Sequence, residues 1–260
     1  MFIIAENLNT RNKPYMEAVK AHNTKTIESM AVVLAEKGAD IINIQCSNDG
    51  VGDEKLLPEL AGIVQKATNL SVCLDTRNFA AIEKTASLCQ KPPMINFLSA
   101  DEPNPQKILS LVRDTGAYLI IRAMKGSVPT TFEAKLLTLE NLIEQANAED
   151  IPNERLFADP SIVHIGAGAG QNHLVNTHYC ITALNEMVDP PINTIAWISN
   201  ISTGLQKGLK SKMNSAFLFY LAGAGLDAAF IDVTDIEIMK TVYLIKAFRD
   251  EIVFSPADIS

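Results

Sequence analysis

The sequence predicts a (β/α)8 barrel in one domain, a ring of eight parallel strands enclosed by helices. Short apolar runs recur eight times, and segments with the 3.6-residue periodicity of an amphipathic helix separate most of them. The runs are continuously apolar rather than alternating, which is typical of parallel strands that are buried on both faces. Eight strand–helix units in 260 residues match the usual length of this fold.

The strands are expected at residues 2–5, 41–44, 70–74, 94–97, 118–121, 156–158, 194–198 and 228–231. A doubly wound parallel sheet is the alternative fold, and it would normally show a glycine-rich turn after its first strand. Here the first run leads into Glu6 and Asn7 instead, which favours the barrel. No linker rich in Pro, Gly or Ser interrupts the pattern, so we expect one domain over residues 1–260.

Three of the intervening helices have clear signals. Residues 24–37 place apolar side chains on one face, and Gly38 follows as a stop signal. Residues 105–115 repeat the pattern and end before Gly116. A third helix is expected over residues 131–148, with Thr130 and Glu133 spaced as a capping box at its start.

The composition indicates a globular protein that acts on small molecules or on other proteins. Hydrophobic residues make up 47% and charged residues 20% of the chain, which excludes a disordered protein. The 30 acidic residues exceed the 22 basic ones and give a net charge of −8. This balance argues against a nucleic acid or an anionic membrane as the partner, because both attract basic surfaces.

We expect a cytoplasmic protein. The first residues lack the basic segment of a signal peptide, and the longest uncharged apolar stretch, 214–226, is too short to span a bilayer. The four cysteines are scattered without a Cys-x-x-Cys pair. Cys73 lies within an apolar run and is expected to be a buried, reduced thiol.

Polar residues at the ends of the predicted strands indicate where the chemistry takes place, because barrel enzymes build their active sites at the carboxyl ends of the strands. The candidates are carboxylates, carboxamides and one hydroxyl: Glu6, Asn43, Asp75, Asn96, Asp159, Ser199 and Asn200. Such groups accept hydrogen bonds or both accept and donate them. They suit a neutral heterocycle with N–H donors beside carbonyl and ring-nitrogen acceptors, although a sugar is also compatible. No histidine falls among them, so we expect no metal.

Other residues give weaker signals. Lys125 follows the fifth strand and could form the Schiff base of an aldolase, but Gly126 beside it indicates an open loop. His173 and His178 are five residues apart, whereas a helical metal pair would be four apart. His164 and the glycine-rich stretch 166–170 are expected to be loop residues without a chemical role, because the stretch lacks a phosphate-binding frame.

Seven short motifs at the strand ends carry a family likeness. They are IIAENLN at 3–9, GADIINI at 38–44, CLDTRN at 73–78, PMINF at 93–97, FADP at 157–160, ISNIS at 198–202 and AGLDAA at 224–229. Together and in this order they resemble the pterin-binding methyltransferases, above all those that act between methyltetrahydrofolate and a corrinoid protein and their relatives in O-demethylase and methylamine-type systems. The resemblance covers essentially the whole chain.

The resemblance implies a barrel, usually a homodimer, that binds the pterin of tetrahydrofolate in its mouth. A methyl group would move between N5 of the folate and the cobalt of a cobalamin that a separate corrinoid protein carries. By position, Asp75, Asn96 and Asp159 would bind the pterin edge, and Asn200 would face N5. Dihydropteroate synthase is a more distant cousin. Its closing strand usually carries a basic motif, and this chain has IDVTD at 231–235.

Two departures from the family pattern affect the expected pterin contacts. The family usually has Asp-x-Asn after the second strand, where this chain has Asn43 and Gln45, and it tends to Gln where this chain has Thr203. They motivate an alternative, a folate-binding protein without catalysis. A further alternative is another barrel enzyme, such as a lysine-dependent aldolase that uses Lys125.

Overall fold

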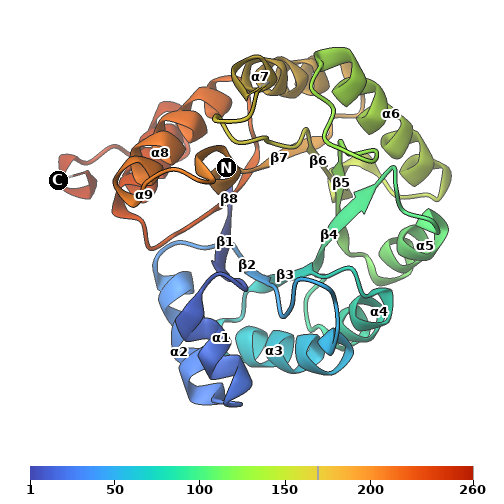
Figure 1. Ribbon diagram of the computed structural model, residues 1–260, viewed down its shortest axis with the longest axis vertical. Helices are drawn as coiled ribbons and strands as arrows, with labels where there is room; N and C mark the ends of the chain where they lie inside the picture. The colour runs from blue at the N-terminus through green and yellow to red at the C-terminus, as the bar shows by residue number, and fades with distance from the viewer. Residues whose placement is uncertain (169, 260) are drawn as a thin grey trace.

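Eight parallel strands close into a barrel in sequence order, with the last strand paired to the first (Figure 1). The computed structural model describes residues 1–168 and 170–259. The strands are β1 (Phe2–Leu8), β2 (Ile41–Ile44), β3 (Ser71–Asp75), β4 (Met94–Ser99), β5 (Tyr118–Arg122), β6 (Leu156–Asp159), β7 (Asn193–Trp197) and β8 (Ala228–Ile231). The predicted (β/α)8 barrel is therefore confirmed, and every predicted strand is present within three residues of its expected ends.

Helices surround the strands on the outside of the ring (Figure 1). Those in the described part of the chain are α1 (Lys13–Lys20), α2 (Thr24–Glu36), α3 (Asp53–Thr68), α4 (Phe79–Leu88), α5 (Pro105–Thr115), α6 (Phe132–Ala148), α7 (Gly170–Met187), α8 (Lys207–Gly223) and α9 (Ile236–Phe248). Short 3-10 turns are η1 (Asn153–Arg155), η2 (Ile198–Ser202) and η3 (Pro256–Asp258). The turn η2 follows β7 directly and carries two of the candidate site residues.

The three helices with sequence signals are confirmed as α2, α5 and α6, but the predicted capping box of α6 is wrong by one residue. Thr131, not Thr130, is the N-cap, and its hydroxyl accepts a hydrogen bond from the backbone N–H of Ala134 at 3.3 Å. Glu133 consequently lies at the second helical position, too early to bond back to the cap. The extended backbone of Thr131 orients its side chain toward the helix.

The core has two layers. Inside the barrel, every strand contributes a buried side chain to one cluster: Ile4, Ile41, Cys73, Met94, Ile120, Phe157, Ile195, Ala228 and Phe230. A larger cluster fills the space between the strands and the helices. Burying one large aliphatic side chain contributes about 1.5–3 kcal/mol to stability, so the filled barrel centre stabilises the fold. Because these side chains occupy the centre, a ligand can bind only at an end of the barrel.

Cys73 is buried as a free thiol, as expected. No helix within residues 1–168 and 170–259 is long and apolar enough to cross a membrane.

Candidate active site

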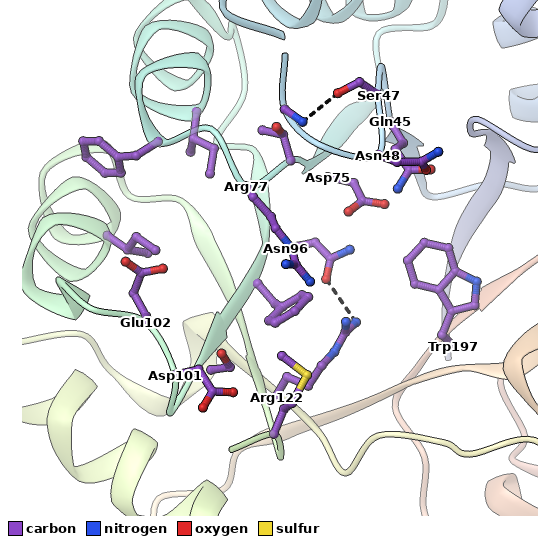
Figure 2. A pocket seen from close by; sticks show the side chains of 18 of the residues that line it. Gln45, Ser47, Asn48, Asp75, Arg77, Asn96, Asp101, Glu102, Arg122 and Trp197 are labelled. Atoms are coloured by element: carbon purple, nitrogen blue, oxygen red, sulfur yellow. Dashed lines mark hydrogen bonds between the residues drawn. The ribbon is translucent and has the colours of Figure 1, made fainter. Parts of the chain in front are cut away.

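A cavity of about 1000 Å³ opens at the carboxyl ends of the strands, above the packed barrel centre (Figure 2). Five of the predicted site residues line it: Glu6, Asp75, Asn96, Ser199 and Asn200. The other two predicted site residues, Asn43 and Asp159, are not among the lining residues. They lie behind residues that do line it.

Asn43 supports Asp75 from the neighbouring strand. Its side-chain N–H donates to Asp75 Oδ2 at 3.3 Å, and Asn43 itself is fully buried. Burial raises the pKa of Asp75 to about 6, while the Asn43 hydrogen bond and the positive charge of Arg122 lower it. Above that pH, Asp75 presents a carboxylate to the cavity as a hydrogen-bond acceptor.

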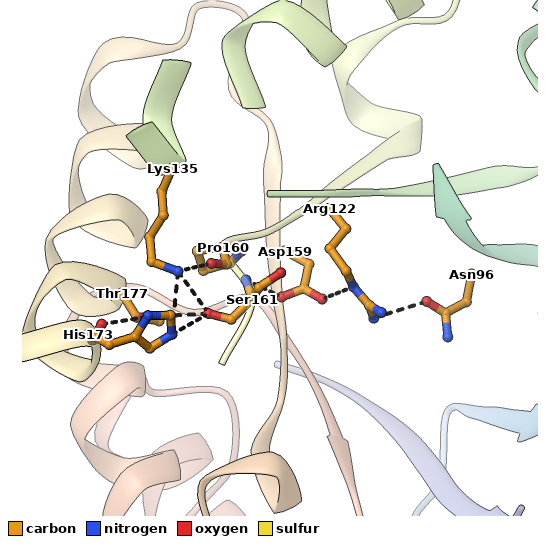
Figure 3. A network of polar contacts seen from close by, with 8 residues as sticks. All are labelled: Asn96, Arg122, Lys135, Asp159, Pro160, Ser161, His173 and Thr177. Carbon is orange, nitrogen blue, oxygen red and sulfur yellow. Dashed lines mark hydrogen bonds and ion pairs between the residues drawn. The ribbon is translucent and has the colours of Figure 1, made fainter. Parts of the chain in front are cut away.

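Arg122, the last residue of β5, connects two further predicted site residues (Figure 3). Its Nε donates to Asp159 Oδ2 at 2.7 Å, and its Nη2 donates to Asn96 Oδ1 at 3.3 Å. The guanidinium carbon lies 3.8 Å from the centre of the Phe97 ring, in a cation–π contact. Since the carbonyl oxygen of Asn96 accepts from Arg122, its amide N–H groups remain to donate to a ligand.

Both oxygens of Asp159 already have partners within the protein. Oδ2 pairs with Arg122, and Oδ1 accepts from the backbone N–H of Ser161 at 2.8 Å. Only 6% of the Asp159 side chain is exposed. The structure thus places Asp159 beside Arg122 and behind the cavity wall, and the predicted contact of Asp159 with a ligand stays a prediction.

A buried lysine holds the segment that follows Asp159 (Figure 3). Lys135 Nζ donates to the carbonyl oxygens of Pro160 and Ser161, and His173 Nε2 accepts from the backbone N–H of Val163 at 2.9 Å. Burial lowers the pKa of Lys135 to about 8 and that of His173 to about 4. These groups support the loop after β6.

Glu6 and Ser199 meet on the opposite side of the cavity, although 193 residues separate them. Ser199 Oγ donates to Glu6 Oε2 at 2.8 Å. Burial raises the pKa of Glu6 to about 7, hydrogen bonds from Ser199 and Trp197 lower it, and the charge of Asp232 raises it. Glu6 can therefore hold or release a proton near neutral pH.

Asn200 follows Ser199 in η2 and has a free carboxamide. The turn is closed by the backbone, because the N–H of Thr203 donates to the main-chain oxygen of Asn200 at 3.2 Å. Within the described residues no hydrogen bond joins the Asn200 side chain to the protein, and the residue lines the cavity. A role limited to capping this turn does not fit that geometry.

Two aromatic residues form apolar walls around the polar groups. The Trp197 ring stacks on Phe230, with ring centres 4.4 Å apart and planes 4° apart, and Trp197 and Phe97 both line the cavity. Sequence reasoning missed Arg122, Phe97 and Trp197 as site residues. Their positions at strand ends were the available signal, but the search there favoured carboxylates and amides.

The weaker candidates lie outside the cavity. Lys125 is exposed, whereas a Schiff-base lysine needs a desolvated amine, so the geometry does not favour an aldolase. His164 is also exposed. Of the glycine-rich stretch 166–170, Ala169 lies outside the described residues. In the described ranges 1–168 and 170–259, no group of three or more His, Cys, Asp or Glu side chains is placed to bind a metal ion.

The three residues that depart from the family pattern lie at different distances from the cavity. Asn43 supports Asp75, as above, and Gln45 lines the cavity while its carbonyl accepts from the Thr10 hydroxyl at 3.1 Å. Thr203 is exposed and does not line the cavity. Only the first two therefore act on the site.

Comparison with known families decides the relationship. A family model described as pterin binding enzyme matches residues 6–232, most of the chain. The chain belongs to the pterin-binding enzyme family. The sequence resemblance to pterin-binding enzymes is therefore confirmed.

The individual proteins that resemble this chain have low sequence identity to it. The chain is 26% identical over 247 residues to a methylcorrinoid:tetrahydrofolate methyltransferase from Eubacterium limosum, covering 94% of this chain and 89% of that protein. It is 24% identical over 256 residues to the methionine synthase of Mycobacterium tuberculosis, covering 93% of this chain but only 21% of that protein. The barrel thus corresponds to nearly the full length of the first relative and to one part of the second.

Solved structures show the same fold. A dihydropteroate synthase from Xanthomonas albilineans superposes with a TM-score of 0.71 at 18% identity, covering 98% of this chain and 94% of the other. A Yersinia pestis dihydropteroate synthase gives a TM-score of 0.70 at 16% identity, covering 96% and 94%. At these identities the likeness concerns the barrel alone.

Proposed function

We propose that this pterin-binding enzyme transfers a methyl group between N5 of tetrahydrofolate and the cobalt of a cobalamin bound to a corrinoid protein. The similarity to a methylcorrinoid:tetrahydrofolate methyltransferase supports the proposal. The observation that carries it is the arrangement of the cavity wall. An acceptor on Asp75 and donors on Asn96 border one open space (Figure 2). The free carboxamide of Asn200 lines the same cavity.

The carboxylate of Asp75 binds the donor edge of the pterin, its 2-amino group and N3–H. Charge-assisted hydrogen bonds of this kind are roughly twice as strong as neutral ones, and the partly buried position of Asp75 strengthens them further. Asn43 keeps the carboxylate oriented through its 3.3 Å hydrogen bond. The amide N–H of Asn96 supplies a donor on the next strand.

Asn200 faces N5 of the folate. Its NH2 group donates to neutral N5 and its carbonyl accepts from protonated N5, so one side chain serves both directions of transfer. It cannot supply a proton, because an amide does not titrate near neutral pH. Glu6 provides that capacity, since its pKa is about 7 and its Ser199 partner is the residue next to Asn200. The folate proton is thus exchanged with Glu6, directly or through water.

The cobalamin arrives on its own protein, because a cavity of about 1000 Å³ does not enclose both a folate and a corrin ring. Cobalt supplies the methyl group or accepts it. The loops after β6 and β7, residues 166–170 and 203–211, are the proposed rim for the corrinoid protein, with Ala169 outside the described residues. A homodimer remains the expectation from the resemblance.

A folate-binding protein without catalysis is the competing function. The test mixes the protein with methylcobalamin and tetrahydrofolate and follows methylcobalamin absorbance together with the formation of 5-methyltetrahydrofolate. Loss of absorbance with matching product supports the methyltransferase. Tight tetrahydrofolate binding by calorimetry without transfer, from either free methylcobalamin or a methylated corrinoid protein, supports the binding protein.

A further inference from the structure

We propose that a groove between α1 and the loop after β2 binds the tail of the folate, and that the enzyme prefers folates whose tail is a chain of γ-linked glutamates. The inference rests on the proposed function in that the substrate is a folate. A pterin bound in the barrel mouth carries its p-aminobenzoyl-glutamate group outward. The tail therefore leaves the mouth along one of its sides, and each glutamate in it adds a carboxylate.

The groove is a second cavity, of about 570 Å³, that adjoins the mouth. Three residues, Thr10, Ser47 and Asn48, line both cavities. The outer wall of the groove is α1, and the inner wall is the segment 46–49 that follows β2. Because the two cavities share these residues, a flexible tail can pass from the mouth into the groove while it stays in contact with the protein.

The shared wall presents hydrogen-bond donors, and Ser47 and Asn48 are visible on the mouth side (Figure 2). Asn48 Oδ1 accepts from the Thr10 hydroxyl at 2.7 Å, the shorter of the two bonds recorded for that hydroxyl, so the amide N–H groups of Asn48 remain to donate. Ser47 Oγ accepts from the backbone N–H of Gly50 at 2.8 Å, and its own hydrogen can be donated. Such a wall suits carboxylates, which only accept hydrogen bonds.

Three basic side chains continue this wall, Arg11 in the mouth and Lys13 and Lys20 in the groove. All three are exposed, and in residues 1–168 and 170–259 none of them forms a side-chain ion pair. Lys13 lies in the first turn of α1, at the positive end of the helix, where a basic residue does not stabilise the helix. The chain as a whole has a net charge of −8, so these positive charges are a local feature that an anionic ligand can use.

The position and the spacing of the two lysines fit a chain of carboxylates. Asn12 caps α1 by accepting from the backbone N–H of Tyr15 at 3.3 Å, and its amide donates to the carbonyl oxygen of Asn7 on β1 at 2.8 Å. The start of the helix is thereby fixed to the end of that strand. Lys13 and Lys20 are two turns apart on one helix face, about 10.5 Å along the axis. A γ-linked glutamate has five chain bonds where a peptide residue has three and spans about 6 Å when extended. Carboxylates two residues apart in the tail therefore match the two lysines.

Two acidic residues of the groove limit the affinity. Asp49 lines it, and its Oδ1 accepts from the backbone N–H of Val51 at 3.1 Å. Glu17 lies between the two lysines on α1 and is exposed. Exposed ion pairs are individually weak, so we expect tetrahydrofolate with five glutamates to bind roughly three- to thirty-fold more tightly than tetrahydrofolate with one. High salt should reduce this preference, because it screens exposed charges.

The side of the mouth next to α4 and α5 offers no comparable excess of positive charge. Arg77 and Lys107 line it together with the carboxylates of Asp101 and Glu102, so the charges balance. The ammonium group of Lys107 also lies 5.9 Å from the centre of the Phe79 ring, in a cation–π contact. Additional carboxylates in the tail would gain little on this side, which favours the groove beside α1.

The experiment measures the affinity of tetrahydrofolate with one glutamate and with five glutamates for the full chain, by calorimetry at low and at high salt. Three variants are compared with the wild type: the double variant Lys13→Gln with Lys20→Gln, the single variant Glu17→Gln, and the double variant Lys55→Gln with Lys66→Gln. The last is the matched control, because it removes the same charge from α3, where both lysines are exposed and line neither cavity. Thermal unfolding verifies that each variant folds.

The variant without Lys13 and Lys20 should lose most of the preference for five glutamates, with little change in its affinity for one. Glu17→Gln removes a negative charge from the groove and should increase the preference roughly two- to five-fold, a gain that a damaged fold would not produce. The control should keep the wild-type preference. Equal affinity of the wild type for both ligands, a preference that survives the loss of Lys13 and Lys20, or an equal loss in the control overturns the role of the groove. A wild type that binds neither ligand overturns the proposed function itself.

Discussion

Replacing Glu6 with Gln tests whether the buried carboxyl group of Glu6 ionises near neutral pH. Glu6 lies on β1 and its carboxylate contacts Ser199 in η2. Gln keeps the size of the side chain and an oxygen that accepts from the Ser199 hydroxyl, which lies 2.8 Å from the carboxylate. It removes only the ability to ionise. Any difference from the wild type that depends on pH therefore reports the ionisation of Glu6.

The sign and the size of the pH effect on stability follow from the pKa of Glu6. In the unfolded chain the Glu6 carboxyl loses its proton near its ordinary pKa of 4.5, whereas burial in the fold raises the pKa to about 7. Between these values the folded protein binds more protons, so the free energy of unfolding falls as the pH rises, and the loss is complete above about pH 7. The difference between the two pKa values corresponds to about 3 kcal/mol.

The assay is urea denaturation of the wild type and Glu6→Gln at pH 5 and pH 8. Part of the loss has already occurred at pH 5, so the stability of the variant relative to the wild type should increase by about 2–3 kcal/mol between the two pH values. The raised pKa of Asp75 affects both proteins alike and cancels in this comparison. Parallel pH dependence in the two proteins would refute the burial argument for Glu6.

Three other substitutions test the candidate site and the backbone of a loop that lines it. Asn200→Ala should lower kcat by about 10²–10³, with a smaller loss of folate affinity, because its hydrogen bond strengthens as charge develops at N5; near wild-type single-turnover rates would contradict this role. Asn43→Asp places a second carboxyl group 3.3 Å from Asp75 and should move the pH midpoint of tetrahydrofolate binding upward from about 6; an unmoved midpoint in a calorimetric titration would show that the position is passive. Gly50→Ala should cost about 1–2 kcal/mol of stability, because its φ is +78° and a Cβ would lie 3.2 Å from that of Asn78. The control Gly62→Ala, inside α3 with open space around it, should stabilise by about 1 kcal/mol, and equal effects in urea denaturation would refute the strain.

The local sequence determined the strands and the end of the barrel that carries the chemistry. Parallel strands that are buried on both faces need continuous apolar runs, so all eight could be predicted without knowing their neighbours. The parallel arrangement then places every strand end at one side of the barrel. That is why Glu6, Asp75, Asn96 and Asn200, scattered over nearly 200 residues, were expected together and do line one cavity.

Only the tertiary structure decided what each polar group does there. Asp159 follows its strand just as Asp75 does, yet Arg122, 37 residues earlier, binds it at 2.7 Å and takes its place on the cavity wall. The titration of Glu6 likewise depends on burial and on Ser199, 193 residues away. Hydrogen bonds and burial are set by which side chains come within about 3 Å across the barrel. The sequence pattern specifies the strand on which a side chain lies, but the neighbour that takes its hydrogen bond is decided only when the ring of strands closes.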